Sequence, residues 1–272
     1  MRTLIDEISV LLGVSSLFLG DDISEKYYAD WSGADACAPV VLVKPNTTEQ
    51  LSQVMALCHK HDQSVVVQGG LTGLAGGATP LDGELAVSLE RMQGVEEIDP
   101  TAMTLTALAG TPLQVLQDAA NEHNLLLPLD LGARGSCQIG GNVSTNAGGT
   151  EVIRYGMTRS LVLGLEAVLA DGTVIDATNK MIKNNSGYDL KHLFIGSEGT
   201  LGIVTRVVLQ LQPKAGSSHT ALCGLNSYES ATQLLVELKR SLGSGLTGFE
   251  LMWDNYYNKV LETIADFTDP LE

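Results

Sequence analysis

The sequence predicts an α+β fold, and three patterns lead to that assignment. The segment Val40 to Val43 is typical of a buried strand, and apolar residues at helical spacing follow it from Thr48. Two further β segments meet at the dipeptide Asp171-Gly172, which favours a hairpin turn. Because strand–helix–strand and hairpin patterns occur in one chain, we expect parallel and antiparallel pairing together rather than a regular α/β alternation.

The composition is that of a globular protein with an acidic surface. The chain has 272 residues, of which 44% are hydrophobic, so it can bury a sizeable core. Its net charge of −16 repels polyanions and argues against nucleic acid or an anionic membrane surface as a partner. Neither a run of about 18 apolar residues nor a secretory cleavage signature occurs. The four cysteines lack zinc-site spacing and give no disulfide framework, so we expect a cytoplasmic protein, with peripheral membrane association left open.

The first elements are predicted as a helix, a strand, a second helix and a second strand. Residues 1–37 form an N-terminal helical appendage, in which the apolar residues at helical spacing are Leu4, Ile5, Ile8, Leu11 and Leu12. Thr47 and Gln50 have the spacing of a capping box for the helix from Thr48, whose apolar face holds Leu51, Val54, Met55 and Cys58. The next strand, "SVVVQ", runs directly into a glycine-rich loop.

The later elements alternate short strands with two helices. We expect strands at 85–89 and 103–108, a hairpin within 162–177, and a strand that ends at Pro213. Thr111 is expected to cap a helix whose first residue is Pro112. Beyond a linker at "KAGSS", a helix ends at Gly243 and has an apolar face of Leu234, Leu235, Leu238 and Leu242.

Three glycine-rich clusters adjoin these β segments. The first is "QGGLTGLAGG" at residues 68–77, the second "DLGARGSCQIGGNVSTNAGG" at 130–149, and the third "IGSEGTLGIVT" at 195–205. The first lacks the G-x-G-x-x-G of a Rossmann fold, and no Gly-Lys-Ser/Thr of a P-loop occurs in the chain. Glycines allow positive φ and expose consecutive backbone N–H groups, which is the chemistry of a pyrophosphate-binding nest. We therefore expect Gly73→Val to do more harm than Thr72→Ser.

The second cluster adds uncharged polar side chains to this pattern. They suit hydrogen bonds to a heteroaromatic ring, a ribityl chain or a phosphate, and they are Ser136, Asn142, Ser144, Thr145 and Asn146. A glycine loop taken alone is more often a turn or a close packing contact. Three such clusters together predict a nucleotide-type cofactor.

Three long segments resemble a known family, the FAD-linked oxidases and dehydrogenases with a PCMH-type (vanillyl-alcohol oxidase-like) FAD-binding domain. The segments are "PLDLGARGSCQIGGNVSTNAGG", "RYGMTRSLVLGLEAVLADG" and "SGYDLKHLFIGSEGTLGIVT". The likeness is to the branch with glycolate oxidase, FAD-dependent D-lactate dehydrogenase and D-2-hydroxyglutarate dehydrogenase. It implies FAD held between two α+β subdomains in residues 38–214, followed at 215–272 by the incomplete beginning of a substrate or cap domain. In that last part, "FELMWDNYYNKV" resembles the domain's first strand and helix.

The resemblance also implies which residues bind FAD. Those of the first cluster are Gly69, Gly70, Leu71, Thr72, Gly73, Leu74 and Ala75, and they cradle the pyrophosphate. Those lining the flavin and its ribityl-phosphate arm are Pro128, Asp130, Ser136, Gly140, Gly141, Asn142, Ser144, Thr145, Asn146 and Gly148. The site is completed by Glu198, Gly199, Gly202 and Ile203. Residues 68–78 contain neither His nor Cys, so we expect non-covalent FAD, with Cys137 as a small packing residue.

The reaction implied by the resemblance is oxidation of a 2-hydroxy acid at its CH–OH group, with hydride passing from the α-carbon to FAD. The family's catalytic base and metal-binding histidines lie beyond the FAD domain. We therefore assign no catalytic residue and no metal here, and expect this fragment alone to be inactive. His59 and His61 are interpreted as surface residues, and His192 as a flank of the FAD site. Arg154 and Tyr155 either approach the flavin or have a structural role.

The partners expected are a small-molecule 2-hydroxy acid, an unidentified electron acceptor, and either a partner subunit or a missing C-terminal domain. Two alternatives stay open. The chain could be a stand-alone FAD-binding subunit of a glycolate-oxidase-like complex, or a non-catalytic FAD-binding module.

Overall fold

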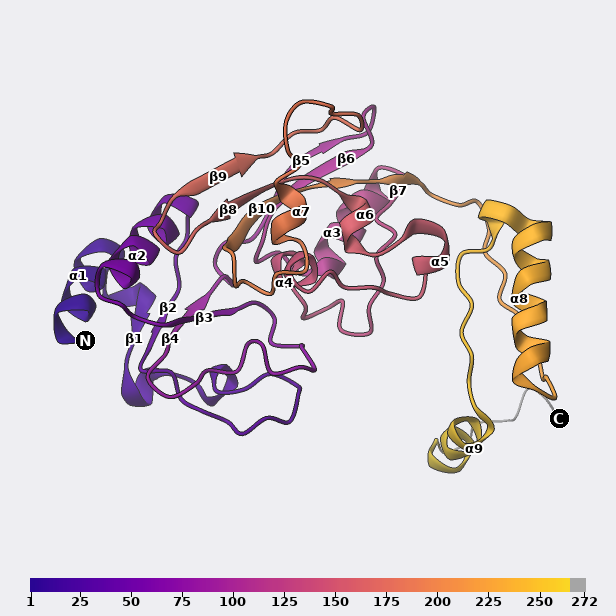
Figure 1. Cartoon of the computed structure of the whole chain (residues 1–272), viewed down its shortest axis with the longest axis horizontal. Helices are drawn as coiled ribbons and strands as arrows, with labels where there is room; N and C mark the ends of the chain where they lie inside the picture. The colour runs from indigo at the N-terminus through magenta and orange to yellow at the C-terminus, as the bar shows by residue number, and fades with distance from the viewer. Residues whose placement is uncertain (265–272) are drawn as a thin grey trace.

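The computed structural model describes residues 1–264 and confirms the α+β class with two separate sheets (Figure 1). The first sheet has four strands in the order β1 (Leu17–Phe18), β2 (Val41–Val43), β4 (Leu85–Ser88) and β3 (Val65–Gln68). In it β2, β4 and β3 are parallel, and β1 pairs antiparallel with β2. The second sheet is antiparallel throughout, in the order β5 (Val95–Asp99), β6 (Thr104–Leu108), β10 (Ile203–Gln210), β8 (Val162–Val168) and β9 (Val174–Ala177). Two short strands, β7 (Leu125–Leu126) and β11 (Gln212–Pro213), pair beside it.

Nine α-helices lie in the described residues, and most are short. They are α1 (Arg2–Leu12), α2 (Thr48–Lys60), α3 (Leu113–Glu122), α4 (Ile139–Ser144), α5 (Val152–Tyr155), α6 (Thr158–Leu161), α7 (Lys191–Phe194), α8 (Tyr228–Leu242) and α9 (Asp254–Thr263). Single 3₁₀ turns occur at Val14–Ser16, Gly20–Asp22, Glu25–Tyr27 and Gly243–Gly245. No helix in this part of the chain has the length and apolar character needed to cross a membrane.

The predicted N-terminal helix is present at Arg2–Leu12 and the helix from Thr48 is present as well, and their apolar faces are buried as expected. Leu4, Ile8 and Leu12 of α1 lie in one core with the predicted face of α2. The cap of α2 differs in one detail. Thr47 Oγ1 accepts the N–H of Gln50 at 3.2 Å, but the Gln50 side chain accepts the N–H of Asn46 at 2.8 Å rather than that of Thr47. The helix therefore starts where the sequence predicts.

The expectation that Thr111 caps the next helix is wrong by one residue. Helix α3 begins at Leu113, and Pro112 lies before it in an extended conformation. The Thr111 hydroxyl donates to the carbonyl of Leu108 at 2.6 Å and accepts the N–H of Gly94 at 2.8 Å. Because this hydroxyl already joins the ends of two strands, it is not available to cap the helix.

The C-terminal segment agrees with the sequence for its helices and differs for its strand. Helix α8 ends at Gly243, which has a φ of +53°, as predicted. Residues 249–252 form no strand, although helix α9 follows them. A strand needs a neighbour for its backbone groups, and these residues pair with none of the strands in the described part of the chain. In Figure 1, α8 and α9 stand away from the two sheets.

A buried carboxylate joins the second sheet to helix α2. Glu166 of β8 is 7% exposed, and its Oε1 accepts the hydroxyls of Thr48 and Thr205, each at 2.7 Å. Arg206 of β10 lies 2.9 Å from the same oxygen. Thr48 is the first residue of α2, so this cluster links the first α+β unit to the second.

A second cluster makes the stability of the first sheet depend on pH. Burial raises the pKa of Glu90, but hydrogen bonds from Lys44 at 2.7 Å, Tyr27 at 2.8 Å and Lys26 at 3.2 Å outweigh it and lower this pKa from 4.5 to about 2. Because the folded pKa is depressed, the stabilisation is complete above about pH 4.5 and is lost as the pH falls towards 2. We expect it to be about 2 kcal/mol, allowing for solvent screening of a partly exposed side chain.

The Glu90→Gln substitution tests this expectation. Unfolding with urea between pH 6 and pH 2.5 should show a shallower loss of stability in the variant than in the wild type. Glu237, an exposed residue of α8 that pairs with Arg240, supplies the matched control, and Glu237→Gln should follow the wild-type profile. Parallel profiles for Glu90→Gln and the wild type would contradict the assignment.

Candidate functional site

The structure brings the three glycine clusters together. A Cβ on Gly70 of the first cluster would lie 2.8 Å from the Cα of Cys137 and still closer to the carbonyl oxygen of Ser136, both in the second cluster. A Cβ on Gly77 would lie 3.0 Å from the carboxylate of Glu198 in the third cluster. Segments far apart along the chain thus meet at the end of β3.

The first cluster presents unpaired backbone donors. Within the described residues, none of the backbone N–H groups from Gly69 to Ala75 donates to a protein acceptor. Leu71 has a φ of +58°, which turns the chain between glycines, and residues 73–75 are exposed. Consecutive N–H groups around a left-handed residue form an anion-binding concavity. This geometry fits the pyrophosphate cradle that the resemblance implies.

The base of this loop is fixed by Gln68. Its Nε2 donates to the carbonyls of Tyr27 at 2.8 Å and Ala78 at 2.9 Å, so one fully buried side chain spans the loop. Its Oε1 and the Oε1 of Gln138 are buried and have no partner among the described residues. A Cβ on Gly69 would lie 3.5 Å from Gln138 Oε1, so the orphaned oxygen of Gln138 lies against the start of this loop. Unpaired buried acceptors are rare in folded proteins, and they mark this base as a place for a donor that the chain itself does not supply.

The predicted residues of the second cluster divide into packed and open positions. A Cβ on Gly140 would lie 2.7 Å from Ala109 Cβ, and one on Gly149, which was not predicted, would collide with the carbonyl of Asp130. Asn142 is buried and accepts from the Cys137 thiol at 3.6 Å. No atom lies within 4 Å of a Cβ on Gly141, and the exposed predicted residues are Ser136, Thr145 and Gly148. Pro128 is buried in the segment that leads into this cluster.

The third cluster docks on the end of α4 through backbone hydrogen bonds. The N–H of Gly196 donates to the carbonyl of Val143 at 3.1 Å, and that of Glu198 donates to the carbonyl of Ser144 at 2.9 Å. Glu198 has a φ of +52° and Gly199 one of +81°. A Cβ on Gly202 would lie 2.9 Å from the Phe194 ring. The left-handed conformations of Glu198 and Gly199 therefore turn the chain of the third cluster from its contact with α4 towards β3.

Arg159 also joins two clusters, and no sequence signal pointed to it beyond its place in "RYGMTRS". Its backbone N–H donates to Asn146 Oδ1 at 2.9 Å. Its guanidinium donates to the carbonyl of His192 at 2.9 Å and to that of Ile195. The planar fork of an arginine can serve two carbonyls at once. Arg159 therefore fixes the third cluster relative to the second.

The Arg159→Lys substitution should loosen the third cluster while keeping the charge. A lysine ammonium lacks the fork needed to reach both carbonyls, so we expect a loss of about 1–2 kcal/mol and faster hydrogen exchange at the N–H groups of Gly196 and Glu198. The matched control is Arg240→Lys on the exposed face of α8, which should leave both amides unchanged. Equal protection of Gly196 and Glu198 in Arg159→Lys and the wild type would refute the role.

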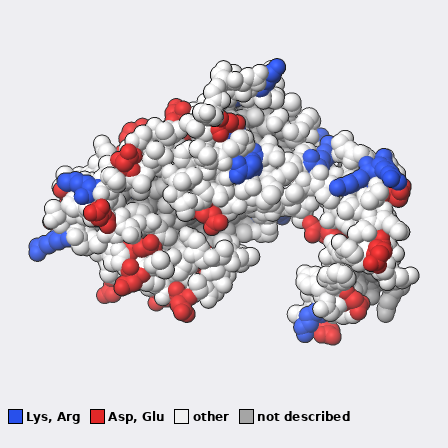
Figure 2. Space-filling view, in the orientation of Figure 1, with Lys and Arg blue, Asp and Glu red and all other residues white. Residues whose placement is uncertain are grey.

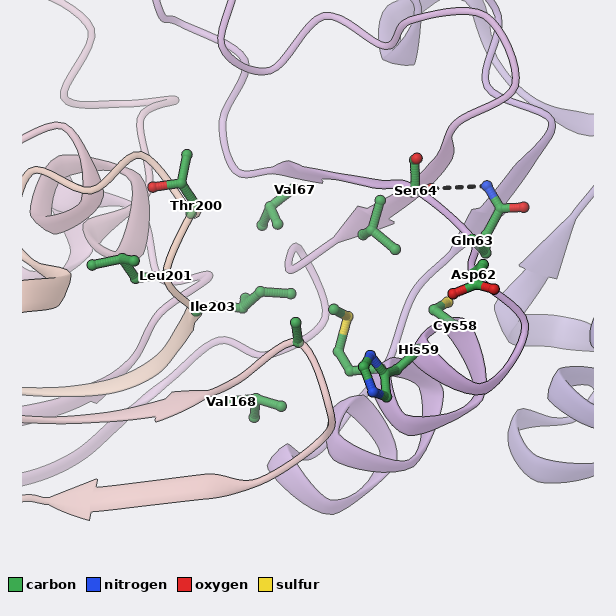
Figure 3. A pocket seen from close by; sticks show the side chains of 15 residues that line it. Cys58, His59, Asp62, Gln63, Ser64, Val67, Val168, Thr200, Leu201 and Ile203 are labelled. Carbon is green, nitrogen blue, oxygen red and sulfur yellow. Dashed lines mark hydrogen bonds between the residues drawn. The ribbon is translucent and has the colours of Figure 1, made fainter.

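A cavity of about 420 Å³ lies beside the third cluster (Figure 3). Of the predicted site residues, Gly199, Gly202 and Ile203 line it. The other lining residues were missed, because they come from the end of α2, from β3 and from β8: Met55, Cys58, His59, Asp62, Gln63, Ser64, Val65, Val67, Val168, Ala170, Thr200 and Leu201. His59, Asp62 and Ser64 gather at one side, while Ile203, Val67 and Val168 are apolar (Figure 3).

The charges around the clusters are largely paired. Asp130 lies 2.6 Å from Arg134, and Arg154 lies 4.8 Å above the ring of Tyr155. His61 Nε2 lies 3.2 Å from Glu7 Oε2, so the side chain of His61 contacts α1 rather than solvent alone. Figure 2 shows Lys or Arg as well as Asp or Glu side chains over the middle of this face. Among the described residues, no group of three or more His, Cys, Asp or Glu is placed to hold a metal ion.

Burial also affects two titratable groups near the clusters. It raises the pKa of the Cys137 thiol, which is 3% exposed, and this agrees with a packing role for the residue. It also raises the pKa of Glu151, and the neighbouring charge of Asp130 raises it further.

Comparison with known proteins adds a family to this geometry. Residues 39–178 match the family described as FAD binding domain. The chain is 42% identical over 261 residues to the probable mitochondrial D-2-hydroxyglutarate dehydrogenase of Oryza sativa subsp. indica, covering 96% of this chain and 47% of that protein. It is 43% identical over 223 residues to the mitochondrial D-2-hydroxyglutarate dehydrogenase of Bos taurus, covering 82% and 41%. The chain thus spans about half the length of the curated relatives it matches.

Solved structures share the fold at low sequence identity. The structure of p-cresol methylhydroxylase with substrate bound has a TM-score of 0.74 and 20% identity, over 88% of this chain and 48% of that one. A structure of alkyldihydroxyacetonephosphate synthase has a TM-score of 0.70 and 21% identity, over 78% and 40%. At such identities the likeness concerns the fold, which is the one that the resemblance of the three long segments implies.

Proposed function

This chain belongs to the family of FAD-binding domains, and we propose that it is the FAD-binding portion of a flavin-dependent D-2-hydroxy acid dehydrogenase. The observation that carries the proposal is the meeting of three glycine clusters around a loop whose backbone N–H groups lack acceptors among the described residues. Such a loop suits a pyrophosphate better than a sugar or an apolar ligand, because a phosphate needs several converging donors.

We propose that the residues named from the sequence hold FAD without a covalent bond. The N–H groups from Gly69 to Ala75 would bind the pyrophosphate, and the open positions around Gly141 and Thr145 would face the ribityl and flavin part. The cavity beside Gly199 and Ile203 is large enough for a heteroaromatic ring and would take the adenine end. Non-covalent binding is supported by the absence of His and Cys from residues 68–78.

When bound, FAD supplies an acceptor for the hydride of the substrate α-carbon. The part played by this chain is to bind and orient the cofactor and to exclude water from its buried edge. No side chain at the clusters is assigned as the base that takes the hydroxyl proton. We therefore propose that the described residues do not complete the reaction, and that residues 215–264 lead into the part that does.

The substrate proposed for the whole protein is D-2-hydroxyglutarate. This rests on the names of relatives that are 41–43% identical to the chain. A cytoplasmic location stays our prediction from composition, although these relatives are named as mitochondrial.

A partner subunit in place of a continuing chain is the second candidate. Both candidates fit the exposed apolar residues of the last segment, among them Leu242 at 51%, Trp253 at 60% and Tyr256 at 60%. In either case these side chains would be covered by further polypeptide, since exposed apolar residues gathered in one segment mark an interaction surface.

The substrate proposal is tested by flavin reduction in the whole protein. Under anaerobic conditions, D-2-hydroxyglutarate should bleach the flavin absorbance at about 450 nm, whereas the L-enantiomer should not, since hydride transfer needs a fixed face of the α-carbon. If only D-lactate or only glycolate reduced the flavin, that acid would replace D-2-hydroxyglutarate as the assigned substrate. No reduction by any 2-hydroxy acid, in a protein that binds FAD, would favour the non-catalytic module.

A further inference from the structure

Asp30 lies directly beneath the first cluster, although it is far from that cluster in sequence. It follows the 3₁₀ turn Glu25–Tyr27 and is 9% exposed. Its carboxylate accepts the N–H of Ser32 at 3.0 Å and the N–H of Ala78 at 3.4 Å. A buried carboxylate that receives several backbone donors usually has a structural or functional purpose.

Thr79 makes the contact between Asp30 and the loop reciprocal. Its hydroxyl accepts the backbone N–H of Asp30 at 3.1 Å and lies 3.3 Å from Asp30 Oδ1, to which it can donate. Gly73 passes over the same carboxylate, because a Cβ there would lie 3.4 Å from Asp30 Oδ2. Asp30 therefore touches both the middle of the loop and its return to the sheet.

Asp30 reinforces the end of the loop, which Gln68 also reaches through the carbonyl of Ala78. Gln68 fixes the start of the loop through Tyr27, and Asp30 fixes its end through Ala78 and Thr79. Both contacts go to residues 27–32, so one short segment holds the loop at two points. The unpaired N–H groups between these points are then held in place before any ligand arrives.

The negative charge of Asp30 opposes the binding of an anion to the loop above it. Burial acts to raise the pKa of Asp30, but hydrogen bonds from Ser32, Ala78 and Thr79 lower it below its ordinary value, so the group is ionised. An ionised carboxylate beneath an anion-binding loop repels a pyrophosphate by Coulomb's law. A benefit to binding can come only from the geometry it imposes.

We propose that Asp30 is a positioning residue that pre-organises the N–H groups of the first cluster for the pyrophosphate of the cofactor. The inference rests on the proposed FAD-binding function. Pre-organisation removes the cost of ordering a loop on binding, and the affinity falls in proportion when the competent conformation is less populated. If Asp30 acted on FAD mainly by charge repulsion, removing its charge would strengthen FAD binding. If it positions the loop, removing its charge weakens FAD binding.

The experiment measures FAD affinity for Asp30→Asn, by titration of the flavin-free 272-residue chain. The amide is nearly isosteric but places N–H donors towards groups that are themselves donors, so we expect binding about tenfold weaker than in the wild type. The matched control is Asp35→Asn, which removes the same charge from an exposed position that has no partner among the described residues. It should bind as tightly as the wild type or slightly more tightly.

Thr79 provides a second pair of variants. Thr79→Val removes the hydroxyl at nearly constant volume and should weaken FAD by about fivefold, while Thr79→Ser keeps the hydroxyl and should restore wild-type affinity. Thermal melting of the flavin-free variants separates this effect from global unfolding. The Thr79→Val variant should already bind FAD more weakly at temperatures well below its melting midpoint, where it is still folded. The serine rescue distinguishes a positioned hydroxyl from general packing.

The outcomes separate the inference from the function it rests on. If the wild type binds FAD and Asp30→Asn binds equally well or more tightly, the positioning role is wrong and the proposed function stands. If Thr79→Ser binds as poorly as Thr79→Val, the positioning role is likewise wrong. If the wild type does not bind FAD, the proposed function fails and this inference fails with it.

Discussion

Gly70→Ala should abolish measurable FAD binding. A Cβ at this position would lie 2.8 Å from the Cα of Cys137 and closer to the carbonyl of Ser136, and neither backbone atom can rotate away. An added methyl in such a contact costs about 3 kcal/mol or more, or forces the first and second clusters apart. Since about 1.4 kcal/mol corresponds to a tenfold change, the affinity should fall by at least about a hundredfold.

Two neighbouring glycines supply matched controls. A Cβ on Gly69 would have its nearest neighbour at 3.5 Å, and one on Gly141 would have none within 4 Å. Gly69→Ala and Gly141→Ala should therefore fold with the clusters in place, and any loss of FAD affinity in them should be far smaller than in Gly70→Ala. Binding by Gly70→Ala within threefold of the wild type would mean that the contact between the two clusters does not shape the site.

Glu166→Ala should destabilise the chain by about 3 kcal/mol, the largest effect expected outside the glycine clusters. The substitution removes the acceptor that Thr48, Thr205 and Arg206 share, and it leaves a cavity between helix α2 and the second sheet. The loss should appear as a lower urea midpoint with one transition, since the junction lies between both units.

Glu96 is the matched control, because it pairs with the same arginine from a more exposed position. Arg206 donates to Glu96 at 2.5 and 2.9 Å, but the Glu96 side chain is 35% exposed. Glu96→Ala should cost less than about 1 kcal/mol. Equal losses of stability in Glu96→Ala and Glu166→Ala would show that the burial of Glu166 at the junction adds nothing to the stability of the chain.

The parts of the fold that depend on local chemistry could be predicted from the sequence. The hairpin turn at Gly172, the helix stop at Gly243 and the start of α2 are set by residues within a few positions of each other. Thr111 shows where such reasoning fails: a residue with the right type for a cap is instead used by Gly94, which is 17 positions away. Residues 249–252 fail for the same reason, since a strand is defined by its neighbour.

The glycine clusters of the candidate site could be predicted from the sequence, but the residues that hold them in place could not. Glycine spacing indicated where backbone donors gather, yet it could not separate Gly140, which packs on Ala109, from Gly141, which is open. Likewise the expectation for Gly73→Val remains a prediction, while the contacts identify Gly70 as the tighter position. Arg159 and Asp30 act through contacts with residues far away in the chain, and a single sequence carries no periodic signal for such contacts.

The central claim is that the meeting of the three clusters forms a non-covalent FAD site, and one titration tests it most directly. The flavin-free 272-residue chain is titrated with FAD and followed by flavin fluorescence, after which the complex is precipitated with acid. We expect saturation at one FAD per chain, with all flavin released into the supernatant and no saturable binding by Gly70→Ala. A wild-type chain that does not saturate, or a flavin that stays in the pellet, would contradict the claim.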